Sequence, residues 1–351
     1  MKRYKIKAKC TISCLMIVVI MFANSVTFIS SAYGADIGKA NSCMVYIRNV
    51  NSGKYIDIQG GTVANGKEVQ LYDGVSSVAQ RWNVVKESGN YYSIRSAINQ
   101  RYFLSVKGDK DVNGAKIALK YIPSGSVVPD SAKFLLFAGS DIGCTYIISK
   151  LNLDSNTSGL RVLDAQQAGT ANGTKLLNYA VYDTLDTAAH QLWVFESINR
   201  TVKTLTWDLV DSSGHCDWDG TTKYMSLFNK AVNAWNSYMG TTRFRPDAWN
   251  RIEDMKISDQ SESKSNPNTL ATTYSNGKIV FYTKPMDKLE SNLQRQHTIM
   301  HELGHALGLN ENRLSTDTEK LGNIMQQGSL AYGTSLSLDD KASYKSASAK
   351  Y

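Results

Sequence analysis

One sequence block occurs three times in the first half of this 351-residue chain. Each copy has an Asn-Gly pair between two short apolar segments, at residues 65–66, 113–114 and 172–173. The copies close on large aromatic residues, which are Trp82, Phe134 and Trp193. Asn-Gly is a strong turn signal between short strands. One block cannot bury its apolar face alone, so we expect three copies to close around a shared core with pseudo-threefold symmetry.

Two of the closing segments carry the pattern Gln-x-Trp, at residues 80–82 and 191–193. They resemble the signature of ricin-type β-trefoil lectins, whereas the middle copy, at 132–134, is degenerate. The resemblance covers roughly residues 40–197. It implies an all-β β-trefoil domain in which Trp82 and Trp193 pack in the interior.

The resemblance also implies carbohydrate-binding pockets. In that family a pocket combines an acid on the strand before the turn, an aromatic platform for a sugar face, and amide side chains. The matching residues in the first repeat are Asp57, Gln70, Tyr72 and Gln80. Those in the third repeat are Asp164, Tyr179, His190 and Gln191. The second repeat has Ser105 in place of the acid, so no pocket is expected there. The alternative is that Asp57 and Asp164 only cap turns.

The string His-Glu-Leu-Gly-His occupies residues 301–305, in a segment whose pattern predicts a helix from about Asn292 to Leu307. Histidines four residues apart lie on one face of a helix. Both imidazoles can therefore converge on one Zn²⁺, which would lower the pKa of a bound water toward roughly 7. Glu302 lies between them and is placed to act as the general base.

The context of this string is informative. Gly308 can end the helix in a left-handed turn, and Glu311 follows three residues later. Residues 323–325, Asn-Ile-Met, resemble a Met-turn, and residues 336–340 resemble the segment that opens a final helix. Together these features are similar to the metzincins, most closely the matrixin-like branch, over roughly residues 204–349.

This second resemblance implies an α+β zinc endopeptidase domain. Its implied zinc ligands are His301, His305 and Glu311, with Met325 beneath them. It also allows a structural Ca²⁺ ion. The family's third ligand is usually His and sometimes Asp, so Glu311 departs from the pattern.

Apolar periodicity predicts further elements in this half. A helix is expected from Tyr224 to Met239. Strands are expected at residues 270–274 and 278–282, joined by a hairpin turn at 276–277. Helices and strands together predict an α+β domain. By its order along the chain, the strand at 270–274 is the candidate for the edge that would pair with a peptide substrate.

The start of the chain predicts export. The first ten residues carry five basic groups and no acid, an apolar run follows at 15–22, and small residues end at 34. This is the pattern of a signal peptide over residues 1–34, which predicts a secreted, extracellular protein with no stable membrane anchor. Loss of the five basic groups lowers the formal net charge from +8 to +3. That balance gives no electrostatic case for nucleic-acid binding.

Three cysteines remain beyond the expected leader. Cys43 and Cys144 both lie in the trefoil segment and are candidates for a disulfide. Cys216 is expected to be a structural or free thiol rather than a group that keeps a zinc site latent.

Two classes of function follow. The first is a secreted zinc endopeptidase that its lectin domain directs to glycans or glycoproteins, with a protein or glycoprotein as substrate. The second is a secreted carbohydrate-binding lectin or adhesin whose protease-like domain is inactive because of Glu311. A third, a gluzincin arrangement with Glu319 as ligand, fits the Gly308 and Met325 context less well.

Overall fold

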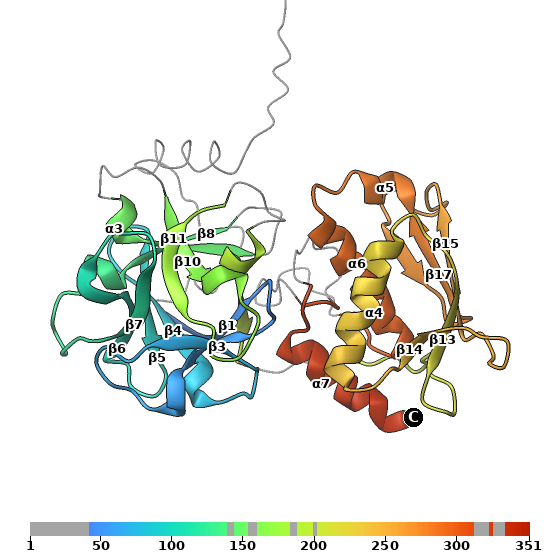
Figure 1. Cartoon of the computed structure of the whole chain (residues 1–351), viewed down its shortest axis with the longest axis horizontal. Coiled ribbons are helices and arrows are strands. Elements are labelled where there is room, and N and C mark those ends of the chain that lie inside the picture. Colours follow the sequence, from blue (N-terminus) through green and yellow to red (C-terminus); the bar gives the residue numbers. More distant parts are fainter. Residues whose placement is uncertain are drawn as a thin grey trace, which may run out of the picture.

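The computed structural model describes residues 42–138, 144–153, 160–182, 188–198, 202–311, 323–325 and 334–351 (Figure 1). Two separate sheets divide this part of the chain, one in each half. The expected leader, residues 1–34, and Glu319 lie outside the described residues. Within the described ranges, no helix has the length and apolar character needed to span a membrane.

The first sheet contains twelve strands. They are β1 (Ser42–Asn49), β2 (Tyr55–Ile58), β3 (Val69–Tyr72), β4 (Arg81–Lys86), β5 (Tyr91–Ser96), β6 (Tyr102–Val106), β7 (Ala115–Tyr121), β8 (Phe134–Ala138), β9 (Thr145–Ser149), β10 (Arg161–Ala165), β11 (Leu176–Ala180) and β12 (Trp193–Ser197). Each repeat supplies four strands, and its middle two form an antiparallel hairpin. Strand β1 pairs with both β4 and β12, so the third repeat closes back onto the first.

The three closing aromatic residues lie in the shared core, as the sequence predicts. Trp82 and Trp193 are fully buried, and Phe134 is almost so. The indole Nε1 of Trp82 donates a hydrogen bond to the carbonyl of Ile56 at 3.0 Å. Trp193 makes the same bond, at 3.0 Å, to a carbonyl of the third repeat. A buried indole N–H needs such a partner, and Phe134 has no group that could make this bond.

The Asn-Gly turns join the repeats to one another. Each asparagine side-chain oxygen accepts a hydrogen bond from a backbone N–H of the following repeat. The pairs are Asn65 with Tyr121 at 3.0 Å, Asn113 with Ala180 at 2.7 Å, and Asn172 with Asp73 at 3.0 Å. The third pair returns to the first repeat, so the bonds form a closed ring. The turn residues thus fix how the repeats meet.

The second half combines helices with a five-stranded sheet. Its strands are β13 (Cys216–Gly220), β14 (Phe244–Pro246), β15 (Met255–Gln260), β16 (Ala271–Thr273) and β17 (Lys278–Tyr282), and its helices are α4 (Met225–Met239), α5 (Thr283–Asp287), α6 (Asn292–Ala306) and α7 (Leu338–Ala347). The strand order is β14-β13-β15-β17-β16, with β16 antiparallel to β17 at one edge. Helices α4 and α6 lie together on one face of the sheet (Figure 1).

The predicted elements of this half agree with the structure to within one or two residues. Helix α4 begins one residue later than expected, and β16 is two residues shorter than the predicted strand at 270–274. Gly277 has φ of 87° in the turn between β16 and β17, as a hairpin of this type requires.

The predicted disulfide is wrong, because no disulfide joins Cys43 to Cys144 although both residues are described. Strand β12 lies between β1, which carries Cys43, and β9, which begins just after Cys144. Its residue Trp193 pairs with Asn49 on one side and with Thr145 on the other. Cys144 is next to Thr145, but Cys43 is six residues from Asn49 along β1, on the order of 20 Å at strand spacing. The cysteines therefore lie toward opposite ends of β12.

Candidate functional site

In the first repeat the predicted sugar-binding residues come together. Asp57 on β2 lies opposite Gln70 on β3, and the Gln70 amide donates to its carboxylate at 3.0 Å. Tyr72 is two residues beyond Gln70, hence on the same face of the strand, and it is 39 % exposed. Burial raises the pKa of the Asp57 carboxyl, while hydrogen bonds from Gln70 and Gln80 oppose this rise.

The third repeat builds a similar group. The Gln191 amide donates to the Asp164 carboxylate at 2.8 Å, and His190 Nε2 lies 3.2 Å from the same oxygen. Tyr179 is half-buried on β11. Tyr182, which the sequence analysis missed, packs edge-on against His190 with ring centroids 4.8 Å apart. The residue is 41 % exposed, and its ring offers a second platform. The sequence signal that could have identified Tyr182 is its position three residues after Tyr179.

Both acids therefore bind amide side chains, which argues against a role limited to turn capping. In the second repeat Ser105 stands opposite Ala118, at the position of the acid in the other two repeats. A hollow of about 220 Å³ opens there, lined by Ser105, Asp109 and Lys120 among others. Asp109 lies in the 3₁₀ turn after β6 rather than on the strand that carries the acid in the other repeats, so the absence of a sugar pocket in this repeat stays a prediction. The carboxylate of Asp109 is paired with Lys120 at 2.7 Å.

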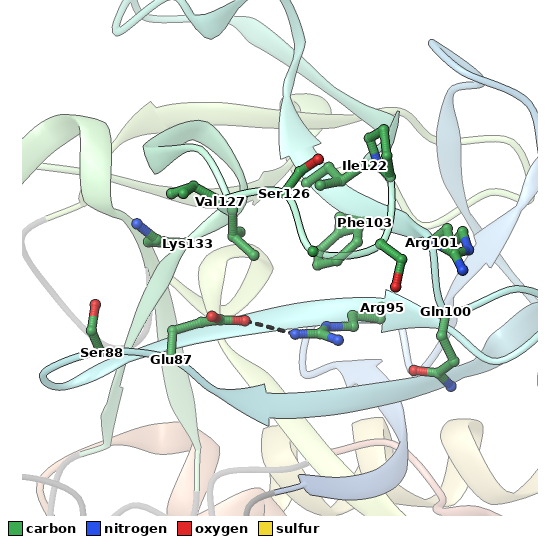
Figure 2. A pocket seen from close by; sticks show the side chains of 14 residues that line it. Glu87, Ser88, Arg95, Gln100, Arg101, Phe103, Ile122, Ser126, Val127 and Lys133 are labelled. Atoms are coloured by element: carbon green, nitrogen blue, oxygen red, sulfur yellow. Dashed lines mark hydrogen bonds and ion pairs between the residues drawn. The ribbon is translucent and has the colours of Figure 1, made fainter.

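A larger hollow, of about 550 Å³, opens beside β5 and was not predicted (Figure 2). Figure 2 shows Arg95 bonded to Glu87 across its floor, at 2.9 Å. Lys133, on its wall, is paired with Asp130 at 3.1 Å. The hollow shares no lining residue with the groups around Asp57 and Asp164. Three of the charged side chains that line it, those of Glu87, Arg95 and Lys133, are thus already paired.

In the second half, helix α6 is fixed at both ends. Ser291 and Gln294 form a capping box, each accepting a backbone hydrogen bond from the other at 3.2 Å. At the other end Gly308 has φ of 80°, the left-handed conformation that ends a helix. The sequence signal at Gly308 is confirmed, whereas the capping box was not predicted.

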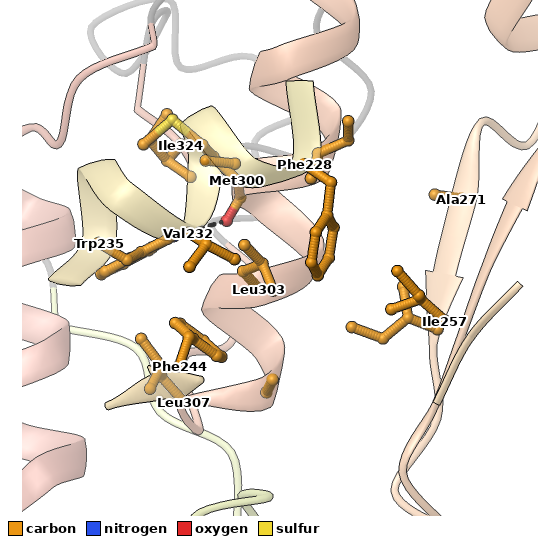
Figure 3. Close-up of a cluster of buried hydrophobic side chains, with 14 of the residues drawn as sticks. Phe228, Val232, Trp235, Phe244, Ile257, Ala271, Met300, Leu303, Leu307 and Ile324 are labelled. Atoms are coloured by element: carbon orange, nitrogen blue, oxygen red, sulfur yellow. Dashed lines mark hydrogen bonds between the residues drawn. The ribbon is translucent and has the colours of Figure 1, made fainter. Parts of the chain in front are cut away.

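The apolar face of α6 packs into the core of this half. Figure 3 shows Met300 and Leu303 of α6 against Val232 and Trp235 of α4. The Trp235 indole donates to the Met300 carbonyl at 3.0 Å. Because this face of α6 packs against α4, the side chains on its opposite face remain available to bind a metal or a substrate.

On that other face, the two predicted histidines are oriented by backbone carbonyls. His301 Nδ1 lies 2.7 Å from the carbonyl oxygen of Ile324, and His305 Nδ1 lies 2.9 Å from that of Leu309. A carbonyl oxygen can only accept, so each Nδ1 carries the proton. Each Nε2 is then left with a lone pair, as a metal-binding imidazole requires. Burial, and then the neighbouring His301, lower the pKa of His305, which favours its neutral form.

Glu311 completes a group that fits a metal ion. Its carboxylate oxygen lies 3.9 Å from His305 Nε2. Ligand atoms of His301, His305 and Glu311 all lie within 4.8 Å of one another. Two neutral imidazoles and a carboxylate are a donor set that zinc accepts. His297, one turn earlier on α6, is outside this group and is buried.

The predicted general base has a partner that the sequence did not indicate. Thr273, on the edge strand β16, donates a hydrogen bond from its hydroxyl to Glu302 Oε2 at 2.6 Å. Glu302 is itself 5 % exposed. The hydroxyl therefore holds one carboxylate oxygen in place and leaves the other available.

Met325 lies against the helix between the two histidines. A Cβ added to Gly304 would approach Met325 Sδ to 2.3 Å. The buried carboxylate of Asp340 accepts hydrogen bonds from the backbone N–H groups of Ile324 and Met325, at 2.9 and 3.1 Å. The same short segment thus positions the methionine and, through the Ile324 carbonyl, His301.

A second group of acids brings Asp211, Asp217 and Asp254 within 4.8 Å of one another. Asp217 is ion-paired with Arg245, so part of its charge is already balanced. The structural Ca²⁺ ion stays a prediction. Cys216 is fully buried in the core, and burial raises the pKa of its thiol well above the usual value. It therefore behaves as a structural thiol.

Comparison with known proteins supports a lectin-like domain in the N-terminal region. A family described as "Ricin-type beta-trefoil lectin domain-like" matches residues 36–120. A designed threefold-symmetric protein, ThreeFoil, is 19 % identical over 43 % of this chain and 96 % of its own, with a TM-score of 0.37. The Rhizoctonia solani agglutinin is 19 % identical over 44 % and 94 %, with a TM-score of 0.35. The C-terminal half of an earthworm R-type lectin, solved with GalNAc, is 18 % identical over 44 % and 98 %, with a TM-score of 0.31. Among curated proteins, none matches this chain.

We predict that Gly304→Ala lowers the free energy of unfolding. Overpacking against Met325 costs about 1–3 kcal/mol, which outweighs a gain in helix propensity of about 1 kcal/mol. Urea unfolding of the 35–351 chain measures the change. In the double variant with Met325→Ala the added methyl group has room. The loss of unfolding free energy in the double variant should therefore be smaller than the sum of the losses in the two single variants. Additive costs would show that the two residues are not in contact.

Proposed function

The N-terminal region is a ricin-type β-trefoil lectin-like domain, and from this premise we propose that the chain is a secreted zinc endopeptidase directed to glycosylated proteins. One observation carries the second part of the proposal. The helix α6 presents two imidazoles, each with Nδ1 bonded to a carbonyl, beside an acid in the position of a general base. The spacing, the tautomers and the acid together are difficult to explain without metal chemistry.

His301, His305 and Glu311 would hold the ion. A bound zinc ion would supply a Lewis acid that polarises a peptide carbonyl and activates water. Glu302 would receive the proton of the attacking water on its carboxylate and deliver it to the leaving amine nitrogen. The Thr273 hydroxyl, at 2.6 Å, keeps that carboxylate in one orientation.

The edge of the sheet supports a peptide substrate. Strand β16 is the last strand of its sheet, so one side of it has no partner strand among the described residues. It also carries Thr273, which contacts the general base. An extended peptide that pairs with this edge would run past Glu302. Backbone pairing binds many sequences, which suits a protease whose target is selected by another domain.

The trefoil would provide that selection. The acids Asp57 and Asp164 each lie beside amide donors and an aromatic ring, the combination that accepts sugar hydroxyls and stacks on a sugar face. Two weak sites on one domain raise the local concentration of a glycosylated substrate without a new contact at the cleavage site.

We predict that the 35–351 chain, supplied with zinc, cleaves a heavily glycosylated protein and that Glu302→Ala slows cleavage roughly a hundredfold or more. Loss of the general base leaves the histidines in place, so zinc content should not change. Glu262→Ala, a surface acid paired with Lys284 at 3.1 Å, is the matched control and should keep full activity. Equal cleavage by wild type and Glu302→Ala would contradict the assigned base. Absence of cleavage by any of them would favour a lectin or adhesin.

We predict that Asp57→Ala combined with Asp164→Ala abolishes retention on a glycan array, because each substitution removes the acceptor for paired sugar hydroxyls. Asp109→Ala, in the second repeat, is the matched control and should leave retention unchanged. Retention of the double variant at wild-type level would remove both pockets from the account.

A further inference from the structure

The two halves of the chain meet at a buried ion pair. Arg48 on β1 and Glu196 on β12 bond to each other, and both are almost completely buried. Glu196 lies opposite Tyr46 in the antiparallel register, so Arg48 is its diagonal neighbour on the same face. The pair therefore belongs to the trefoil and lies on the strands that close its ring.

Both members of this pair also bind the second half. Arg48 Nη1 donates to the carbonyl oxygen of Ser335 at 2.7 Å. The backbone N–H of Leu338 donates to Glu196 Oε2 at 3.3 Å. The Leu338 side chain packs with Tyr46 and Tyr55 of the trefoil in one buried apolar cluster. In Figure 1 the start of α7 is the part of the second half that approaches β1 and β3. We call residues 335–338 the docking segment.

The docking segment leads directly to the metal-binding group. Ser337 caps α7 through the N–H of Asp340, and its own N–H donates to the Asp340 carboxylate at 2.8 Å. That carboxylate also holds the N–H groups of Ile324 and Met325. The carbonyl of Ile324 in turn orients His301. Hydrogen bonds and short stretches of backbone thus connect Arg48 and Glu196 to a proposed zinc ligand.

A trefoil that acted only as a tether would not require a buried ion pair bonded to the docking segment. Removing two charges from water is unfavourable unless their remaining hydrogen-bonding groups find partners. Here the docking segment supplies part of those partners, and Tyr55 supplies another by donating to Glu196 at 2.9 Å. Two glycines of the trefoil leave space for the docking segment. A Cβ at Gly53 would approach Ser335 to 2.6 Å. A Cβ at Gly74 would approach Leu338 to 3.0 Å.

We propose that Arg48 and Glu196 are positioning residues for the metal centre, so that the lectin-like domain is a structural part of that centre as well as its targeting module. By holding the docking segment they fix Asp340, the Ile324–Met325 segment and the His301 ring. The inference rests on the proposed zinc site. It adds that two residues more than a hundred positions away from the ligands determine how well that site is formed.

The test uses the 35–351 chain and has two readouts. One is the affinity for Zn²⁺, measured by competition with a chromophoric chelator. The other is the visible spectrum of the Co²⁺ form. Arg48→Met and Glu196→Gln should each weaken Zn²⁺ binding, at most by the roughly 10- to 100-fold that losing a direct partner of a ligand costs. They should also change the Co²⁺ spectrum. Arg161→Met breaks another trefoil ion pair, with Asp111 at 2.8 Å, and should leave both readouts unchanged.

Two further variants separate positioning from general stability. In the double variant Arg48→Met with Glu196→Met no buried charge remains unpaired, so the thermal midpoint should return toward the wild-type value. Its Zn²⁺ affinity should stay low because the polar contacts to the docking segment are still missing. Ser335→Ala with Leu338→Ala removes the Ser335 hydroxyl that accepts from Arg48 Nη1 at 2.5 Å and the packing of the Leu338 side chain on Tyr46 and Tyr55. It changes no trefoil residue and should weaken Zn²⁺ binding in the same way.

The outcomes distinguish the two proposals. Wild-type Zn²⁺ affinity and Co²⁺ spectrum in all of these variants would overturn the positioning role and leave the zinc site intact. A double variant that regains stability and affinity together would show that Arg48 and Glu196 act only on folding. A wild-type chain that binds neither Zn²⁺ nor Co²⁺ would overturn the proposed function and this inference with it.

Discussion

The buried carboxylate of Asp340 is the interaction on which the second half of the molecule depends. It accepts hydrogen bonds from the backbone of Ile324, Met325 and Ser337, and so joins the Ile324–Met325 segment to the start of α7. Burial raises its pKa, while these donors oppose the rise. A buried carboxyl is tolerated only when it is bonded in this way. Its position connects the proposed zinc ligands on one side to the trefoil on the other.

The trefoil is stabilised by a different constraint, the closed ring of asparagine bonds between repeats. Each bond is a modest interaction, on the order of 1 kcal/mol net, but the ring fixes the mutual position of the hairpins. The proposed sugar-binding groups lie on two of those hairpins. Their acids, amides and rings come from strands whose register is set. A rigid scaffold of this kind holds a shallow pocket in shape before any ligand arrives.

Local sequence patterns predicted the features that depend on neighbours along the chain. The spacing of His301 and His305 placed both on one helical face, and Gly308 marked the helix end. Long-range contacts gave no such signal. Nothing near Thr273 indicates that it would bind Glu302, and Arg48 is 287 residues from Ser335, which it contacts. The disulfide was predicted wrongly for the same reason, because strand register decides which cysteines can meet.

The most direct test of this account is the zinc content of the purified 35–351 chain, wild type beside Glu311→Ala, after equilibration with a limited supply of Zn²⁺. The account predicts one zinc ion per wild-type chain and a clear loss in the variant, because two imidazoles alone leave the ion without its carboxylate ligand. A wild-type chain without zinc, or a variant that keeps the full amount, would contradict the assignment of His301, His305 and Glu311 as the ligand set.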